Sequence, residues 1–311
     1  MINFVTIVSD DYWPGAAALI HSVRSNACLR INQYQFSIIC NLNAVPRRWL
    51  SSRDENINLL SINDLPVIEI LTPQKQGRRM EVALQKLSIF ALPSINSYYV
   101  YIDSDMICLG SLAELLSLHK FSICPDEIYG LGFDRSHSEL SKVELNTGLM
   151  VFKPSLSAYQ SILAYYQKHH QEISFKGDQD IINGWIKSNK IDVNYLSSEF
   201  NFCKRFQDKI GPLHTRALIK NLRILHYVGA KPWMSNTQII SQRECLYYSL
   251  ERLWWKYFNS SRYSRYESFN VSSLTPFVRQ FILPFIKPII LQESVKRIFN
   301  RLVKLFSKGK H

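Results

Sequence analysis

The amino-acid sequence predicts an α/β fold, with one domain of about 250 residues and a basic C-terminal extension. Its first segments have the character of a strand, a polar turn and a helix, the order that begins a nucleotide-binding α/β sheet. A later run of strand-forming residues, at 98–102, ends in two aspartates. The hydrophobic content of 46% is typical of a globular chain rather than a disordered one.

The first part of the chain alternates between the two kinds of element. Aromatic and β-branched residues predict strands at 4–8, 35–40, 67–71 and 98–102. Apolar residues at helical spacing predict helices at 16–25, 46–55, 80–91 and 110–118. This alternation favours a sheet covered by helices.

The second part continues the pattern with shorter strands. We expect a strand at 121–124, and another within 145–154, where a polar turn precedes it. Two short strands are expected between 193 and 202, and a last one ends at His226. Helices are expected at 155–169 and from Asp178 onward. The glycine in the polar turn, Gly148, suggests close approach of the backbone to a ligand or a neighbour.

The two aspartates after the strand at 98–102 are Asp103 and Asp105. In an extended chain, side chains at i and i+2 point the same way, so the two carboxylates would repel unless a cation neutralises them. Hard oxygen ligands favour Mg²⁺ or Mn²⁺, which substrate phosphates often complete. The alternatives are that Asp103 caps the following helix or that both acids lie in a solvated turn.

Several other residues have two readings each. Asp10 and Tyr12 could bind and stack on a base, or an aspartate there could cap the helix. Lys86 could point into a phosphate site or extend along the surface. The chain lacks Gly-x-Gly-x-x-Gly and a Walker lysine, which argues against a dinucleotide or ATP site.

Asp178, Gln179 and His226 complete the candidates from local pattern. Asp178 could be a helix N-cap, a role that does not explain Gln179 beside it. A lone histidine on an apolar strand, such as His226, is usually a core residue. Imidazole suits Mn²⁺, however, and two aspartates leave a place for it.

The six cysteines are scattered without a Cys-x-x-Cys, the usage of a reduced, cytosolic protein. The first eight residues lack a basic segment and are followed closely by Asp10, so we expect a strand there and not a secretory signal. No uncharged apolar run reaches the roughly 20 residues of a membrane-spanning helix.

Most of the net charge of +12 belongs to the C-terminal extension. Residues 252–311 contain 12 Lys and Arg against two Glu. Residues 294–308 form a basic amphipathic pattern, typical of a helix that lies on an anionic membrane surface. The alternative is a helix docked on the core, and nucleic acid is not expected as a partner. We therefore divide the chain into a domain at 1–250, a linker at 251–275 and a membrane-association tail at 276–311.

A series of short motifs, taken together, resembles glycosyltransferase family 8, which includes glycogenin and bacterial lipopolysaccharide galactosyl- and glucosyltransferases. The resemblance covers roughly residues 3 to 235. The motifs, in chain order, are Phe-Val-Thr-Ile-Val at 4–8, Gln85-Lys86-Leu87, Asp103-Ser-Asp105, Asn146-Thr-Gly148, Gly177-Asp-Gln-Asp180, Phe200-Asn-Phe202 and His226-Tyr-Val-Gly229 with Lys231-Pro-Trp233.

This resemblance implies a single Rossmann-like domain of the GT-A type, a UDP-hexose donor, Mn²⁺ with Mg²⁺ as an alternative, and retention of anomeric configuration. Here one residue separates Gly229 from Lys231, where the family usually has two. The implied roles are metal ligands for Asp103, Asp105 and His226, with Asp103 also near the donor ribose; uracil contacts for Asp10 and Tyr12; phosphate or sugar contacts for Lys86, Asn146, Gly229 and Lys231; and places beside the anomeric carbon for Asp178, Gln179 and Asp180.

Gln179 is a poor nucleophile, so we expect the acceptor to attack from the leaving-group face rather than through a covalent intermediate on Asp178 or Asp180. The predicted protein is a hexosyltransferase that uses UDP-glucose or UDP-galactose and extends a lipid-linked saccharide such as lipopolysaccharide core. We expect it in the cytoplasm, on the inner face of the membrane. The alternatives are a glycogenin-like self-glucosylating primer and a non-catalytic sugar-nucleotide-binding protein.

Overall fold

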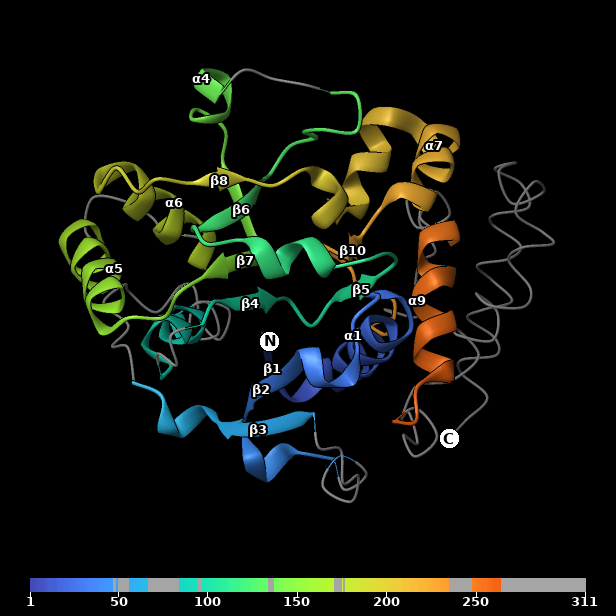
Figure 1. The fold of residues 1–311 in the computed structure, drawn as a ribbon, viewed down its shortest axis with the longest axis horizontal. Helices are drawn as coiled ribbons and strands as arrows, with labels where there is room; N and C mark the ends of the chain where they lie inside the picture. The colour runs from blue at the N-terminus through green and yellow to red at the C-terminus, as the bar shows by residue number, and fades with distance from the viewer. Residues whose placement is uncertain are drawn as a thin grey trace, which may run out of the picture.

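The computed structural model describes residues 1–46, 49, 56–66, 84–93, 97–133, 137–170, 175, 177–234 and 248–263. Its centre is a seven-stranded sheet in the order β3-β2-β1-β4-β7-β6-β8 (Figure 1). β7 runs antiparallel to both of its neighbours, and the other paired strands are parallel. The strands are β1 Ile2–Val8, β2 Tyr34–Cys40, β3 Ile57–Ser61, β4 Tyr99–Ile102, β6 Ser122–Pro125, β7 Leu145–Phe152 and β8 Asn194–Tyr195.

A second, three-stranded sheet lies beside the first in the order β5-β10-β9. Its strands are β5 Met106–Cys108, β9 Phe202–Cys203 and β10 Ile224–His226. β10 runs antiparallel to β5 and parallel to β9. Because β5 starts directly after the Asp103 to Asp105 turn, this sheet joins the end of β4 to the strand that carries His226.

Helices cover both faces of the central sheet, and each face has its own core. The helices are α1 Trp13–Asn26, α4 His137–Leu140, α5 Leu156–His169, α6 Asp178–Ser188, α7 Gln207–Leu218 and α9 Tyr248–Ser260. Alternate residues of one strand enter different cores, as the pleat requires. Phe4 belongs to the core shared with α1 and α9, whereas Val5 belongs to the core shared with α5 and α6.

The structure confirms the α/β class and most predicted elements. Strands lie at or within two residues of the expected positions for β1, β2, β4, β6, β9 and β10, and helices α1, α5 and α6 are present. The predicted helix at 80–91 is described from residue 84, where a helical turn passes into a 3-10 helix at Ser88–Ala91.

Three features differ from the prediction. β3, β5, α4 and α7 were not expected. The segment 110–118 contains a 3-10 helix at Ala113–Ser117 instead of an α-helix. The polar residues Asn146 and Thr147 belong to β7 itself instead of a turn before it, because their side chains are buried and hydrogen-bonded to other side chains. The predicted helix at 46–55, except for Pro46 and Trp49, and the strand at 67–71 lie outside the described residues.

The predicted boundary at residue 250 falls inside helix α9. This helix packs against α1, and its residues Trp254, Trp255 and Phe258 are buried in the core that β1 and α1 share. The part of the predicted linker up to residue 260 is therefore helical, and Tyr263 is also buried. The predicted tail at 276–311 lies outside the described residues. Within the part of the chain that the structure describes, no helix is both long and apolar enough to cross a membrane.

Trp254 is the centre of an aromatic cluster that attaches α9 to the domain. Its ring stacks on Trp233 and on Phe258, with ring centroids 5.0 Å apart in both pairs. We predict that Trp254→Ala lowers the free energy of unfolding by about 3–5 kcal/mol, because it leaves a cavity in the core. Urea unfolding measures this loss. The exposed Arg252 on the same helix is the control, and Arg252→Ala should change stability by less than about 0.5 kcal/mol. Equal effects of the two substitutions would contradict this packing role.

Candidate active site

A cavity of about 800 Å³ opens at the edge of the sheet beyond the carboxyl ends of β1 and β4. Residues from the turn after β1, the Asp103 to Asp105 turn, β7, the start of α6 and the loop after β10 line it. This is the edge at which open α/β sheets bind their ligands. The sequence separates these segments by more than 200 residues, and the topology gathers them here.

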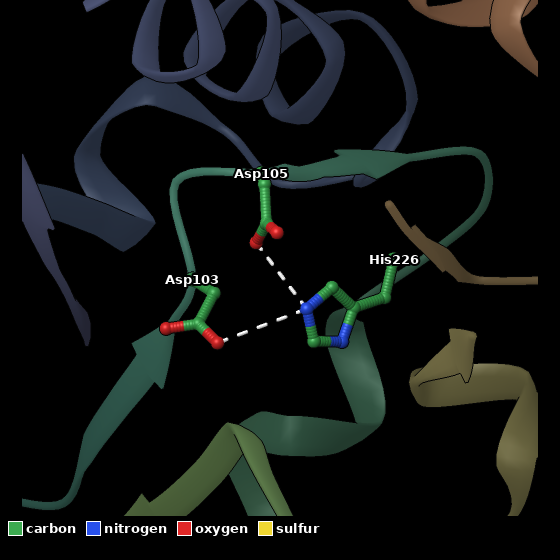
Figure 2. A group of neighbouring side chains, drawn as sticks. All are labelled: Asp103, Asp105 and His226. Atoms are coloured by element: carbon green, nitrogen blue, oxygen red, sulfur yellow. Dashed lines mark ion pairs between the residues drawn. The ribbon is translucent and has the colours of Figure 1, made fainter. Parts of the chain in front are cut away.

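Asp103, Asp105 and His226 converge on one point of this cavity (Figure 2). The His226 Nε2 atom lies 3.2 Å from Asp105 Oδ1 and 3.8 Å from Asp103 Oδ2. One ligand atom from each residue lies within 4.8 Å of the other two. Two carboxylate oxygens and an imidazole nitrogen form a donor set that fits Mn²⁺, and also Mg²⁺ when oxygen ligands dominate. The three side chains therefore form a candidate divalent metal site.

Backbone hydrogen bonds hold the three ligands in place. The Asp103 amide donates to the Gly148 carbonyl at 2.8 Å, and the Tyr227 amide donates to the Asp105 carbonyl at 3.0 Å. His226 pairs with Met106, next to Asp105, across the β10 and β5 ladder. The pairing of β5 with β10 thus brings the histidine to the aspartates, although about 120 residues of sequence separate them.

Gly148 leaves the space that His226 occupies. A Cβ atom at this position would lie 2.5 Å from His226 Cε1 and 2.6 Å from Met106 Cε. The close approach expected at this glycine is confirmed, and the neighbour is the imidazole ring.

Lys86 is buried and points into the site. Its Nζ atom lies 3.2 Å from Asp103 Oδ1 and 3.0 Å from Asp178 Oδ2. Burial by itself would lower the pKa of Lys86, but the two carboxylates outweigh it and raise the pKa. The alternative of a surface lysine is therefore wrong, since only 7% of the residue is exposed.

Asp103 and Asp178 have other partners besides this lysine. The Tyr101 hydroxyl donates to Asp103 Oδ1 at 2.6 Å, and the Thr147 hydroxyl donates to Asp178 Oδ2 at 2.6 Å. Burial raises the pKa of Asp103, and Lys86 opposes that change. Gly177, and not Asp178, is the N-cap of α6, so the capping alternative for Asp178 is wrong.

Asp105 lies between two cationic side chains. Its Oδ1 atom faces His226, and Lys231 Nζ donates to its Oδ2 atom. Burial would raise the pKa of Asp105, but His226 and Lys231 outweigh it and lower the pKa. Burial would lower the pKa of His226, but Asp105 reverses this and raises it to about 10. The solvated-turn alternative for Asp105 is therefore wrong, because the residue is only 5% exposed.

The turn after β1 contributes Tyr12, half-buried at the cavity wall. Its ring centroid lies 5.5 Å from that of Trp233 and 5.8 Å from Lys231 Nζ. Asp10 is exposed and is not among the residues that line the cavity, whereas its neighbour Asp11 is. Tyr12 is the N-cap of α1, so neither aspartate caps that helix.

The cavity lining also contains two residues that the sequence reasoning missed, Asp126 and Arg205. Asp126 Oδ1 accepts from Asn146 Nδ2 at 2.8 Å and forms an ion pair with Arg205, and its Oδ2 atom accepts from Gln179 Nε2 at 3.3 Å. Asp126 directly follows β6, the same signal that identified Asp103, so the sequence could have indicated it. Arg205 has no comparable local signal.

The remaining predicted residues also lie at the cavity. Asp180 lines it near Gln179, and Gly229 lines it beside Lys231. Gly229 has a φ of +78°, which favours glycine, and the chain turns there between His226 and Lys231. The cavity wall therefore includes every predicted site residue except Asp10.

Comparison with known proteins places these features in one family. The family model described as glycosyl transferase family 8 matches residues 3–237. Glycogenin from Neurospora crassa is 26% identical over 281 residues, which cover 89% of this chain and 37% of that protein. Glycogenin-2 from Homo sapiens is 26% identical over 238 residues, which cover 74% of this chain and 43% of that protein. The chain therefore spans less than half the length of these relatives.

Among solved structures, the galactosyltransferase LgtC, in complex with donor and acceptor sugar analogues, superposes with a TM-score of 0.57. The two share 15% sequence identity, and the match covers 84% of this chain and 96% of that one. This likeness concerns the fold, and it confirms the predicted GT-A type architecture.

The raised pKa of His226 makes metal binding depend on pH. At pH values between about 6.5, the ordinary pKa of histidine, and about 10, the metal-free folded protein keeps His226 protonated. A histidine that binds a metal must give up this proton. We predict that Mn²⁺ binding at pH 7 releases about one proton and that affinity rises with pH, by up to about tenfold per unit. Calorimetry in two buffers of different ionisation enthalpy counts the protons. In His226→Gln this release should disappear, and a wild-type count of zero would contradict the prediction.

Proposed function

The chain belongs to glycosyltransferase family 8, and from this premise we propose that it transfers glucose or galactose from a UDP-sugar to a glycan acceptor with retention of configuration. The observation that carries the proposal is the convergence of Asp103, Asp105 and His226 within a cavity that also contains Lys86 and Lys231. This is a metal site with additional positive charge, which suits a sugar diphosphate.

In this proposal, Asp103, Asp105 and His226 hold Mn²⁺, with Mg²⁺ as an alternative. The bound ion would supply Lewis acidity to the UDP leaving group. Lys231 extends from the loop after β10 toward Asp105, and it places an ammonium group where negative charge develops on the departing diphosphate. Tyr12 offers a partly exposed ring at the same end of the cavity, where a uracil base would stack.

The donor sugar would then lie between the metal site and the start of α6. The Asp126 carboxylate accepts the Gln179 Nε2 hydrogen, which leaves the Gln179 carbonyl oxygen to face a partner elsewhere. Asp178 is a weak nucleophile here, because its carboxylate is held by Thr147 and Lys86. These contacts favour attack from the leaving-group face. The acceptor oxygen forms a bond to the anomeric carbon as the bond to the diphosphate breaks, and the acceptor proton passes to the departing phosphate.

We propose a peripheral location on the cytoplasmic face of the membrane and a lipid-linked acceptor such as lipopolysaccharide core. The support is the basic amphipathic pattern at 294–308. A glycogenin-like primer activity is the second candidate, because both relatives described above are glycogenins. Intact mass after incubation with UDP-glucose separates the two, since self-glucosylation adds hexose units to the protein itself.

Release of UDP from a panel of UDP-sugars in Mn²⁺ tests the transferase proposal. We expect turnover with one hexose donor and a loss of more than about 100-fold in Asp105→Asn, because even an outer partner of a metal ligand costs about 10–100-fold. Asp192→Asn is the matched control, since Asp192 pairs with Lys120 at the surface at 2.7 Å. Equal turnover of Asp105→Asn and the wild type would refute the role of the site. Trapping of a glycosyl-enzyme on Asp178 or Asp180 would refute same-face attack.

Deletion of residues 276–311 tests the membrane proposal. Each nearby Lys or Arg contributes about 1 kcal/mol of attraction to an anionic surface. We expect the full chain to sediment with vesicles that contain phosphatidylglycerol and not with pure phosphatidylcholine vesicles. The deletion should abolish sedimentation and leave UDP release with a soluble acceptor intact. Unchanged vesicle binding would assign the membrane contact to another part of the chain.

A further inference from the structure

Asn201 lies directly behind the His226 ring and has no role in the function proposed above. It belongs to the Phe200-Asn-Phe202 motif and is only 1% exposed. It immediately precedes β9, which pairs with β10 so that Cys203 lies opposite His226. A polar side chain this deeply buried needs hydrogen-bond partners. The partners of the Asn201 side chain are His226 and Asn146.

The side-chain contacts form a continuous chain from His226 to Asp126. His226 Nδ1 lies 2.9 Å from Asn201 Oδ1. Asn201 Nδ2 donates to Asn146 Oδ1 at 2.8 Å, and Asn146 Nδ2 donates to Asp126 Oδ1 at 2.8 Å. Asn146 is 5% exposed and His226 is 4% exposed, so these groups are shielded from bulk water.

The direction of the hydrogen bonds in this chain is fixed from both sides of Asn146. An ionised Asp126 can only accept, so Asn146 must present its NH₂ group to it. The Gly148 backbone amide can only donate, and it lies 3.0 Å from Asn146 Oδ1. Both constraints give the same amide orientation. Asn146 Oδ1 must therefore receive the Asn201 NH₂ group, which turns Asn201 Oδ1 toward His226.

An amide oxygen facing His226 Nδ1 requires a proton on that nitrogen. The lone pair of the neutral ring is then on Nε2, the atom that faces Asp103 and Asp105. We propose that Asn201 is a positioning residue that fixes the tautomer of His226, with its own orientation set through Asn146 by Asp126 and the Gly148 amide. This inference rests on the metal-binding role of His226 in the proposed function.

The proposed arrangement has a chemical purpose. A histidine that ligates a metal commonly donates its other N–H to an acceptor, which orients the ring and strengthens the ligand. Asp126 also accepts from Gln179, so one carboxylate sets the orientation of two side-chain amides of the cavity lining. When a metal binds, Nε2 gives up its proton, while the Nδ1 proton stays on the ring and is donated to Asn201 Oδ1.

The tautomer can be read directly by nuclear magnetic resonance on the full chain with ¹⁵N-labelled histidine. Cd²⁺ serves as a diamagnetic substitute for Mn²⁺, and His226→Gln identifies the signals of His226 among the eight histidines. We expect the proton on Nδ1 and the metal on Nε2 in the wild type. A proton on Nε2, or the absence of any metal binding, overturns the proposal.

Two substitutions test Asn201 itself. Asn201→Leu removes the acceptor at similar volume, and we expect Mn²⁺ affinity to fall about 10–100-fold, as measured from free Mn²⁺ by electron paramagnetic resonance. Asn201→Asp still offers an acceptor oxygen to Nδ1 and should keep the wild-type tautomer. Asn3→Leu is the control, because Asn3 is also buried, at 5% exposure, and bonds to Ser97 away from the cavity. It should alter stability without altering the tautomer or Mn²⁺ affinity.

The outcomes separate this inference from the proposed function. Unchanged affinity and tautomer in a folded Asn201→Leu protein overturn the positioning role. If this variant does not fold, the Cd²⁺-bound spectra of the wild type and of Asn201→Asp still decide, since an Nε2 proton in either metal-bound spectrum contradicts the proposal. Metal binding is measured without any UDP-sugar, so a protein that binds Mn²⁺ as described but releases no UDP would refute the transferase proposal alone.

Discussion

Two carboxylates enclosed at the end of a buried strand are the constraint on which the rest of this structure depends. Asp105 is almost fully buried and Asp103 is only partly exposed. Charges in such a place are costly unless paired and hydrogen-bonded. The fold supplies Lys86 to Asp103, and His226 and Lys231 to Asp105. These cations come from two separate segments, one with Lys86 and one with His226 and Lys231, so the site is complete only in the folded chain.

The antiparallel strand of the central sheet, β7, contributes to this site. β7 runs antiparallel between β4 and β6 and brings Asn146, Thr147 and Gly148 to the edge where β4 ends. The first two residues supply buried polar contacts, and the glycine leaves room for the His226 ring. In a parallel strand, these first residues would lie at the other edge of the sheet, where β4 begins. Helix α9 supports the same edge from outside, because Trp254 stacks on Trp233, two residues after Lys231.

The cavity lining contains two polar clusters of different chemistry. The metal site combines aspartates with lysines, whereas the second cluster is organised around Asp126, which holds Asn146, Gln179 and Arg205. The hydrogen bonds through Asn146 and Asn201 connect the two clusters. Orientation of the metal ligand and orientation of Gln179 thus depend on the same carboxylate, and a change at Asp126 would affect both.

Local pattern was sufficient for the parts of this protein that depend on neighbours in sequence. Hydrophobic period predicts the buried strands and the helices α1, α5 and α6. Side-chain direction in an extended chain predicts that Asp103 and Asp105 point toward the same place. The ordered motifs extended this to the family and to most of the cavity lining. Short or polar elements such as β3 and β5 were missed, because a few residues carry too little periodicity to be distinguished from loops.

Only the tertiary structure decided which side chains meet. From sequence, Lys86 could be a surface lysine and Asp178 a helix cap. Both readings fail, because the two residues pair with each other, Lys86 also with Asp103 after β4, and Asp178 also with Thr147 on β7. Asp126, Arg205 and Asn201 have partners that lie between about 20 and 80 residues away in the chain. Hydrogen bonds and ion pairs depend on distances of about 3 Å, which strand order and register determine and which no local spacing encodes.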